Sequence, residues 1–375
     1  MRLVTLALLA AACLAAAAGA QTRKKLIEFG WDLPYPDDLR RNIREMEKRP
    51  FDGVVVRPRA AWNVFRKQPL DPAKFETDIA DLKATRFERF TDNFLLVWAT
   101  TDEGWDWTSD TDWRAAEANI RLMARIAKAG RFVGIMFDPE PYGPNPWDYK
   151  KRPRAGDLSF AEYARIVRRC GARFLRIVQQ EIRDPRILTL FHVSLFGDLL
   201  DEPDPAKRQQ RLASHEWGLL APFLDGMLDA AEPRTVIIDG NEFAYYYPNS
   251  EGFYRAVHTT YRRALALVDP RNHAKYARQV QLGQALYMDL TFALQPNPER
   301  LPAFRLTPEQ RARWFEHNVY QALYTADEIV WCYSERMDWW KGNVPPGAEE
   351  AIRSARSKIE AGKPLGFSLD FLSRP

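Results

Sequence analysis

Residues 131–143 read RFVGIMFDPEPYG, and this stretch decides the fold. Its first part, 131–138, predicts a β-strand because large apolar side chains alternate with small or polar ones: Val133, Ile135 and Phe137 against Gly134, Met136 and Asp138. In a closed barrel the large side chains face outer helices and the others face a narrow lumen. A strand of an open doubly wound sheet would be apolar on both faces. The pattern therefore favours a barrel.

Seven further strand patterns occur along the chain, and each of the eight is followed by a helical pattern. The strands are expected at 26–31, 52–57, 93–98, 131–138, 187–194, 234–239, 279–288 and 328–334. The helices are expected at 37–49, 72–86, 112–129, 159–182, 213–231, 250–268, 307–325 and 347–361. This alternation predicts parallel strands with right-handed crossovers, and eight repeats predict a single (β/α)8 TIM barrel over 21–375 with long loops after its strands. No Gly-x-Gly-x-x-Gly follows the first strand, which argues against a dinucleotide site.

The same alternation assigns inward faces to other strands. In the first strand Glu28, Gly30 and Asp32 are expected to face the lumen, with Ile27, Phe29 and Trp31 outside. In the fifth, His192 and Ser194 are expected inside, and in the seventh Gln281, Gly283 and Ala285.

The ends of the chain suggest its compartment. Residues 1–20 have a basic start, an apolar run and a small-x-small cleavage site at Ala18–Ala20, which is typical of a signal peptide. We expect a secreted or periplasmic protein after cleavage near Ala20. No later apolar run is long enough for a membrane span. At the other end, 364–372 is expected to dock on the barrel exterior.

Composition narrows the partners and cofactors. The formal net charge is +4 and like charges do not cluster, so nucleic acid is not an expected partner. Cys170 and Cys332 fall in a helical and a strand pattern and are expected to be buried free thiols rather than a disulfide. The five His form no metal-binding motif, so neither a metal nor another cofactor is predicted. The sequence gives no indication of oligomeric state.

Acidic residues stand at or just after five of the predicted strands. They are Asp32, Asp138, Glu140, Asp239, Glu242, Asp289 and Glu335. Each could simply cap the next helix, but together they predict a mouth crowded with carboxylates. Such crowding separates the pKa values of neighbouring carboxyl groups, so that one stays protonated while another is ionised. Glycoside hydrolysis requires such a pair.

Two segments are the best candidates for that pair. In FDPEPYG (137–143) two prolines stiffen the chain around Glu140, and Asp138 lies on the same side. In IDGNEFAYYY (238–247) Glu242 is followed by a tyrosine cluster. We assign Glu140 as general acid/base and Glu242 as nucleophile or second catalytic carboxylate. Asp138 and Asp239 would tune them, and Asp289 or Glu335 would be the alternatives to Glu242.

With these segments the chain resembles the (β/α)8 glycoside hydrolases. Asp138-Pro139-Glu140 looks like the acid-bearing strand of chitinase-type enzymes, without their longer spaced-Asp signature. A pair after strands four and six is similar to that of α-galactosidase-type barrels, which use two Asp. Cellulase-like enzymes have Asn-Glu after strand four and Glu after strand seven, where this chain has Pro-Glu and Asp289. The resemblance implies a glycosidase acting on an oligo- or polysaccharide but assigns no family.

Aromatic and polar side chains near the strand ends are expected to bind the sugar, since sugar rings stack on aromatic faces. The predicted binding residues are Asp32, Arg57, Trp98, Tyr142, His192, Asn241, Tyr245, Trp331 and Tyr333. Two other functions remain open: a carbohydrate-binding barrel without catalysis, and a metal-assisted hydrolase or lyase on the same fold.

Overall fold

The computed structural model describes residues 24–373, so the predicted signal peptide, 1–20, lies outside the described residues. The strands are β1 (Lys25–Glu28), β2 (Gly53–Val56), β3 (Asn63–Phe65), β4 (Phe94–Thr101), β5 (Gly134–Asp138), β6 (Arg186–Thr189), β7 (Val236–Asp239), β8 (Val280–Leu282), β9 (Gln284–Tyr287) and β10 (Ile329–Tyr333). The helices are α2 (Pro36–Met46), α3 (Glu76–Ala84), α4 (Asp110–Ala129), α5 (Phe160–Glu181), α6 (Gly197–Leu200), α7 (Pro205–Ser214), α8 (Leu220–Ala230), α9 (Ser250–Tyr261), α10 (His273–Gln279), α11 (Met288–Thr291), α12 (Pro308–Thr325) and α13 (Ala348–Glu360).

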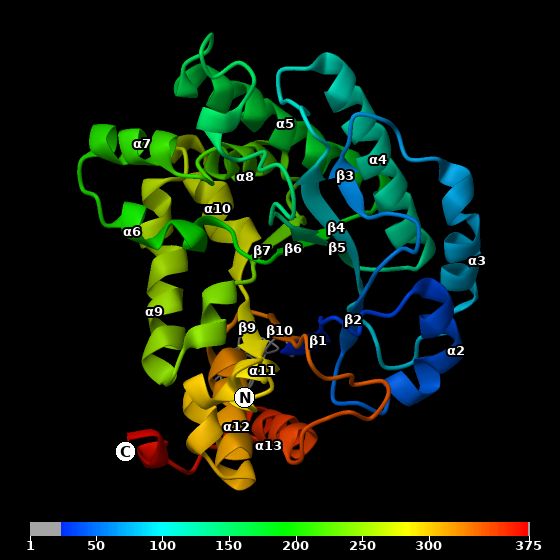
Figure 1. Cartoon of the computed structure of the whole chain (residues 1–375), viewed down its shortest axis with the longest axis vertical. Coiled ribbons are helices and arrows are strands. Elements are labelled where there is room, and N and C mark those ends of the chain that lie inside the picture. Colours follow the sequence, from blue (N-terminus) through cyan, green and yellow to red (C-terminus); the bar gives the residue numbers. More distant parts are fainter. Residues whose placement is uncertain (1–23, 374–375) are drawn as a thin grey trace, which may run out of the picture.

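The strands form a parallel barrel surrounded by helices, as predicted (Figure 1). Their order is β8-β7-β6-β5-β4-β2-β1-β10-β9. Strands β8 and β9 are the two halves of the expected strand 279–288, and Gly283 separates them. Because β8 pairs with β7 and β9 pairs with β10, the ring of strands closes at this glycine. A Cβ on Gly283 would lie 3.0–3.3 Å from residues 238–240, so the close approach of the two backbones favours glycine here.

The long helices begin at residues whose side chains cap the helix N-terminus. Ser159 and Glu162 form a reciprocal capping box at α5, and Thr307 and Gln310 do the same at α12. The helix expected over 213–231 begins later than predicted, as α8, and α7 is an additional helix that lies almost entirely before the expected start. Gly218 lies in the turn between them, where a Cβ would come 2.1 Å from the Leu212 carbonyl oxygen. The helix expected over 250–268 ends at residue 261, and β3, α6, α10 and α11 are additional.

The side chains that face the lumen were predicted correctly for β5 but not for β1. Leu96, Met136, Leu188 and Ile238 are in register around the lumen, which places Asp138 inside as predicted. In β1, however, Ile27 is in register with Trp331, whose indole nitrogen donates across the lumen to the Gly240 carbonyl oxygen, 2.8 Å away.

The first strand is therefore the reverse of the prediction. Ile27, Phe29 and Trp31 face inward, and Glu28 and Asp32 face the helices. The physical reason is that aromatic rings, rather than small or polar side chains, fill this part of the lumen.

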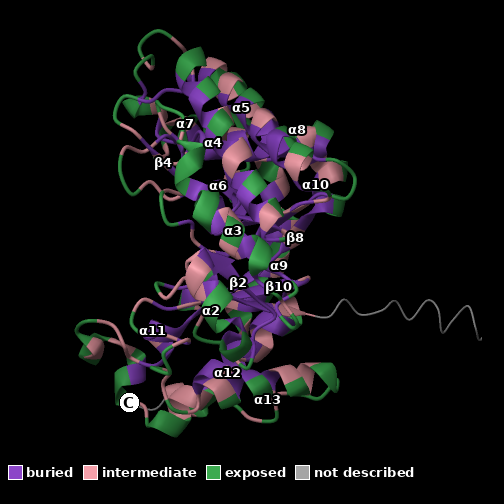
Figure 2. Ribbon diagram, turned by 90° about the vertical axis from the view of Figure 1, so that its right-hand side faces the viewer, coloured by how far each residue is buried: buried purple, intermediate pink, exposed green. Residues whose placement is uncertain are grey.

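Burial is concentrated in the central strands and on the helix faces turned toward them (Figure 2). Cys170 and Cys332 are buried and free, as expected. The C-terminal segment docks on α12 and α13: Lys358 Nζ donates to the Leu365 carbonyl oxygen at 2.7 Å, and the Arg313 guanidinium lies 5.6 Å from the Phe367 ring. Within residues 24–373, no helix combines the length and apolar character that a bilayer crossing requires.

Candidate active site

Three carboxyl groups come together at the carboxyl ends of β5 and β7. Glu140 follows β5, and Glu242 begins the 3₁₀ turn Glu242–Tyr246 after β7. The charges of Glu140 and Glu242 both raise the pKa of Asp138, and the charge of Glu140 raises the pKa of Glu242. Because such effects require proximity, the two predicted catalytic residues share one site.

Glu140 is held by its neighbours on both sides. Its backbone nitrogen donates to Asp138 Oδ1 at 2.8 Å, and the Tyr142 hydroxyl donates to Glu140 Oε2. The carbonyl of Pro139 accepts a 2.7 Å bond from the Trp147 indole. Asp138 itself is 1% exposed, and burial, followed by the Glu140 charge, raises its pKa well above the ordinary value. Asp138 thus holds the backbone of Glu140 from a buried position that favours its neutral form.

Glu242 lies in a different environment. It follows Asn241, which has a left-handed backbone (φ 46°), and its own nitrogen donates to the Leu190 carbonyl oxygen at 3.1 Å. Within residues 24–373 its carboxylate accepts no hydrogen bond. Burial, and then the charge of Glu140, raise the pKa of Glu242 to about 8.

The two carboxyl groups are therefore unequal. At neutral pH Glu242 holds a proton, and Glu140 accepts a hydrogen bond from Tyr142, whereas Glu242 accepts none among residues 24–373. Sequence analysis assigned the acid role to Glu140. Burial, and then the Glu140 charge, instead give Glu242 a raised pKa, as a proton donor requires.

Aromatic rings wall the site. Tyr245 is stacked on Tyr333 with ring centroids 5.6 Å apart, and Tyr142 packs on Trp98 at 4.7 Å. The Tyr245 hydroxyl is buried, has no hydrogen-bond partner within residues 24–373, and lies near enough to Glu242 for that charge to raise its pKa. An adjoining cavity of about 380 Å³ is lined by Asp138, Trp98, Tyr142, Tyr333, Arg57 and Trp31, among others.

Two exposed rings of the rim were missed as binding residues. Trp31 is 67% exposed and donates from its indole to the Tyr333 hydroxyl at 3.0 Å, and Tyr246 is 63% exposed. Trp31 was missed because its strand was given the wrong inward face. Tyr246 lies in the tyrosine cluster of IDGNEFAYYY. Its position just after a predicted strand could have marked it as a residue of the rim.

Three residues predicted for the site lie behind the barrel wall instead. Asp239 points outward, since it follows the inward Ile238, and its oxygens accept bonds from the backbone nitrogens of His192 and Ser194 at 3.1 Å. His192 is 0% exposed and 6.1 Å from the Tyr276 ring, and burial lowers its pKa to about 4. Asn241 donates to Gln284 Oε1 at 2.7 Å.

These contacts correct the prediction for all three residues. The fifth strand ends at residue 189 rather than 194, because the chain turns there to bind Asp239. Asp239, His192 and Asn241 thus fix the loops after β6 and β7 and do not reach the cavity.

The two alternatives to Glu242 are less well placed. Asp289 is buried and accepts bonds from Ser334 Oγ (2.6 Å) and the Glu335 nitrogen (2.9 Å), so it holds the loop after β10. Glu335 lies beside Tyr333, whose hydroxyl is 3.5 Å from Glu335 Oε1. Trp331 is fully buried and forms the floor of the lumen rather than a sugar platform.

Asp32 and Glu28 form a separate acidic pair on the outer face of β1. Asp32 Oδ2 accepts a 2.7 Å bond from the Trp339 nitrogen. Neither oxygen of Glu28, which is 1% exposed, has a donor among residues 24–373, so its contact with Asp32 requires a shared proton. Burial, and then the Asp32 charge, raise the pKa of Glu28 well above 4.5.

This pair makes stability depend on pH. Folding takes up a proton at Glu28, so its stabilising contribution is complete below the unfolded pKa and is lost as the pH rises toward the folded pKa. Glu28→Gln supplies an amide donor without that proton. We expect it to raise the thermal midpoint by a few degrees at pH 8 and to change it little at pH 4, by calorimetry. Exposed Glu45→Gln is the control, and a lower midpoint for Glu28→Gln at pH 8 would contradict the shared proton.

Within the described residues 24–373, no three His, Cys, Asp or Glu side chains are arranged to hold a metal ion.

Neither a family model nor a curated protein matches the sequence. Several solved structures share the barrel. A GH5_18 protein from Streptomyces cattleya in complex with GlcNAc is 13% identical, with a TM-score of 0.49 over 92% of this chain and 82% of its own. A Bacteroidetes-affiliated GH5 cellulase is 10% identical, with a TM-score of 0.48 over 94% and 95%. A GH5 lichenase from a Caldicellulosiruptor species is 10% identical, with a TM-score of 0.48 over 88% and 92%.

Proposed function

We propose that this protein is an exported glycoside hydrolase that cleaves an oligo- or polysaccharide with two carboxyl groups. The observation that carries the proposal is the pairing of Glu140 and Glu242 in one aromatic-walled mouth, where Glu242 is buried with a raised pKa and Glu140 accepts a hydrogen bond from Tyr142. A glycosidase needs one protonated and one ionised carboxyl group on either side of the scissile bond.

The environments assign the roles. Glu242, protonated at neutral pH, donates its proton to the glycosidic oxygen as the bond breaks. Glu140, held by Tyr142 and by the Asp138 contact to its backbone, acts as the ionised partner that attacks the anomeric carbon or activates water. The buried Tyr245 hydroxyl, which has no hydrogen-bond partner among residues 24–373, lies near Glu242 and could donate to it after a small side-chain shift.

The direct test is a screen of the purified protein against a panel of polysaccharides, measuring released reducing ends. We expect hydrolysis of at least one. Binding by calorimetry without any release of sugar would overturn the enzyme proposal in favour of a binding barrel.

The pH dependence follows from the raised pKa of Glu242. Because the acid must be protonated, kcat/KM should be high below pH 8 and fall about tenfold per pH unit above it. A pH profile on one substrate measures this basic limb. A basic limb near pH 4.5, the ordinary value for Glu, would contradict the acid role of Glu242.

Export is proposed from the sequence pattern of residues 1–20. Expression in a bacterial host should release a protein beginning near Gln21 into the periplasm or medium. N-terminal sequencing of the product measures this, and an intact Met1 terminus in the cytoplasm would contradict it.

A further inference from the structure

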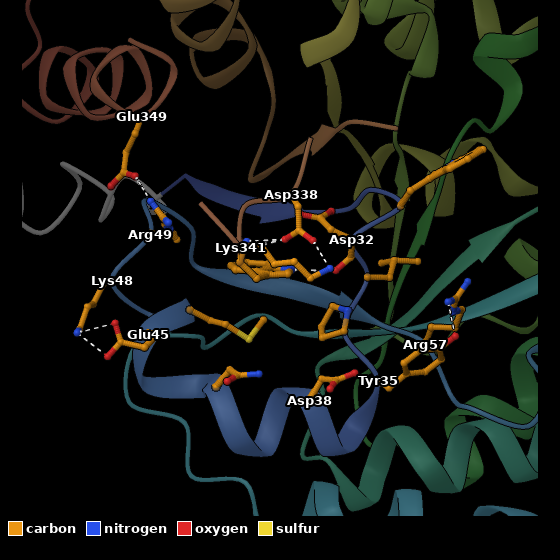
Figure 3. A pocket seen from close by; sticks show the side chains of 16 residues that line it. Asp32, Tyr35, Asp38, Glu45, Lys48, Arg49, Arg57, Asp338, Lys341 and Glu349 are labelled. Carbon is orange, nitrogen blue, oxygen red and sulfur yellow. Dashed lines mark hydrogen bonds and ion pairs between the residues drawn. The ribbon is translucent and has the colours of Figure 1, made fainter. Parts of the chain in front are cut away.

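Arg57 lies where the catalytic mouth meets a second hollow. It follows β2 and points inward, and it lines both the 380 Å³ cavity at the mouth and a groove of about 860 Å³ beside α2 (Figure 3). Trp31 and Leu33 also line both. A chain bound at the catalytic pair and extending toward α2 would therefore pass Arg57.

The Arg57 side chain is fixed but not neutralised. Its guanidinium carbon lies 4.7 Å from the Tyr35 ring centre and 4.9 Å from that of Trp62. One terminal nitrogen donates to the Tyr35 hydroxyl at 2.5 Å, as Figure 3 shows. Its Nε is buried without a partner, and no carboxylate within residues 24–373 forms an ion pair with it.

The other cations of the groove are neutralised by acids of the same groove. Lys48 pairs with Glu45 at 2.6 Å, Arg49 with Glu349 at 2.7 Å and Lys341 with Asp338 at 2.8 Å.

The two remaining acids of this lining do not supply a charge for Arg57. Asp38 pairs with Arg41 at 2.5 Å. Asp32 lies on the outer face of β1, where its Oδ2 accepts a 2.7 Å bond from the Trp339 nitrogen, and it forms no ion pair with Arg57 among residues 24–373. Among the described lining residues, Arg57 thus stands as a cation with a free hydrogen-bonding edge.

We propose that Arg57 binds an acidic group of the substrate, the carboxylate of a uronic acid residue or a sulfate ester. This inference rests on the proposed glycosidase function. Withdrawing a cation from water is unfavourable unless an anion and hydrogen bonds compensate. A guanidinium whose plane is fixed by flanking rings presents a fork that matches a carboxylate with two hydrogen bonds. The exposed Trp31 ring beside it provides a face for the same sugar.

The test compares matched substrates on the full chain. The first pair is a glucuronic-acid-bearing polysaccharide and the same polymer with its carboxyl groups reduced to alcohols. The second is a sulfated polysaccharide and its desulfated form. We expect kcat/KM to be about tenfold or more higher on the acidic member of one pair, which identifies the anion. Equal rates on both members of both pairs would overturn the inference.

Variants of Arg57 distinguish a role in substrate specificity from a role in folding. They also distinguish a failure of this inference from a failure of the proposed function. Arg57→Gln should abolish the preference for the acidic member, so that its kcat/KM ratio between the acidic and the neutral member falls about tenfold or more, to near one. Arg57→Lys should retain part of the preference, since it keeps the charge but loses the fork. A preference that survives in Arg57→Gln would overturn the assignment. If instead the wild type cleaves nothing in either pair or in a neutral panel, the glycosidase proposal itself fails. If Arg57→Gln does not fold, the inference is still tested by Arg57→Lys and by the comparison of matched substrates on the wild type.

Discussion

Glu140→Gln should lower kcat on the natural substrate by a factor of about 10²–10⁴ without lowering the thermal midpoint. The amide has the shape of the carboxylate and can still accept the bond from Tyr142, and the backbone contact to Asp138 does not involve the side chain. What is lost is the negative charge that attacks or activates water. Steady-state kinetics with a folding measurement on the same preparation test this.

Glu335→Gln is the matched control for this prediction. Glu335 is also a rim carboxylate, but it lies beside Tyr333 after β10 and outside the Glu140–Glu242 pair. Its amide variant should retain activity within about tenfold. If Glu140→Gln were as active as Glu335→Gln, Glu140 would not be catalytic.

Glu242→Gln should cause a loss of similar size on a polysaccharide but a much smaller loss on an aryl glycoside with a strongly acidic phenol. A good leaving group departs without a proton, so the general acid contributes little to its cleavage. Glu140→Gln should be slow on both substrates, because displacement of either leaving group requires the carboxylate that attacks the anomeric carbon or activates water. Comparing kcat/KM of both variants on both substrates assigns the roles.

The reverse outcome is equally informative. If Glu140→Gln were rescued by the good leaving group and Glu242→Gln were not, Glu140 would be the acid, as the sequence pattern suggested.

The barrel and the two main acidic segments were predictable because they rest on local patterns. The alternation in 131–138 correctly placed Asp138 inside and Phe137 against the outer helices, where its ring lies 5.1 Å from Phe174. The prolines on either side of Glu140 and the tyrosines after Glu242 marked loops at the ends of β5 and β7, and the fold brings these loops to one mouth.

The inward face of β1 and the roles of the two glutamates were not predictable in this way. Alternation shows that Phe29 and Glu28 face opposite sides, but which side is the lumen depends on pairing with β10, about 300 residues away in the chain. The prediction that Asp239 faces the mouth was wrong for a similar reason. The turn after β6 that binds Asp239 is a tertiary contact, which a local pattern does not reveal. The acid role follows from the burial of Glu242, which is a property of the folded site.

The hydrogen bond from the Trp331 indole to the Gly240 carbonyl joins β10 to the end of β7, across the place where β8 gives way to β9 at Gly283. The ring of strands is least continuous at that junction, and the indole braces it from within. This hydrogen bond thereby links the segments that carry two residues of the mouth: Tyr333, two residues beyond Trp331, and Glu242, two residues beyond Gly240. The separation of Tyr333 and Glu242 across the mouth therefore depends in part on this one hydrogen bond.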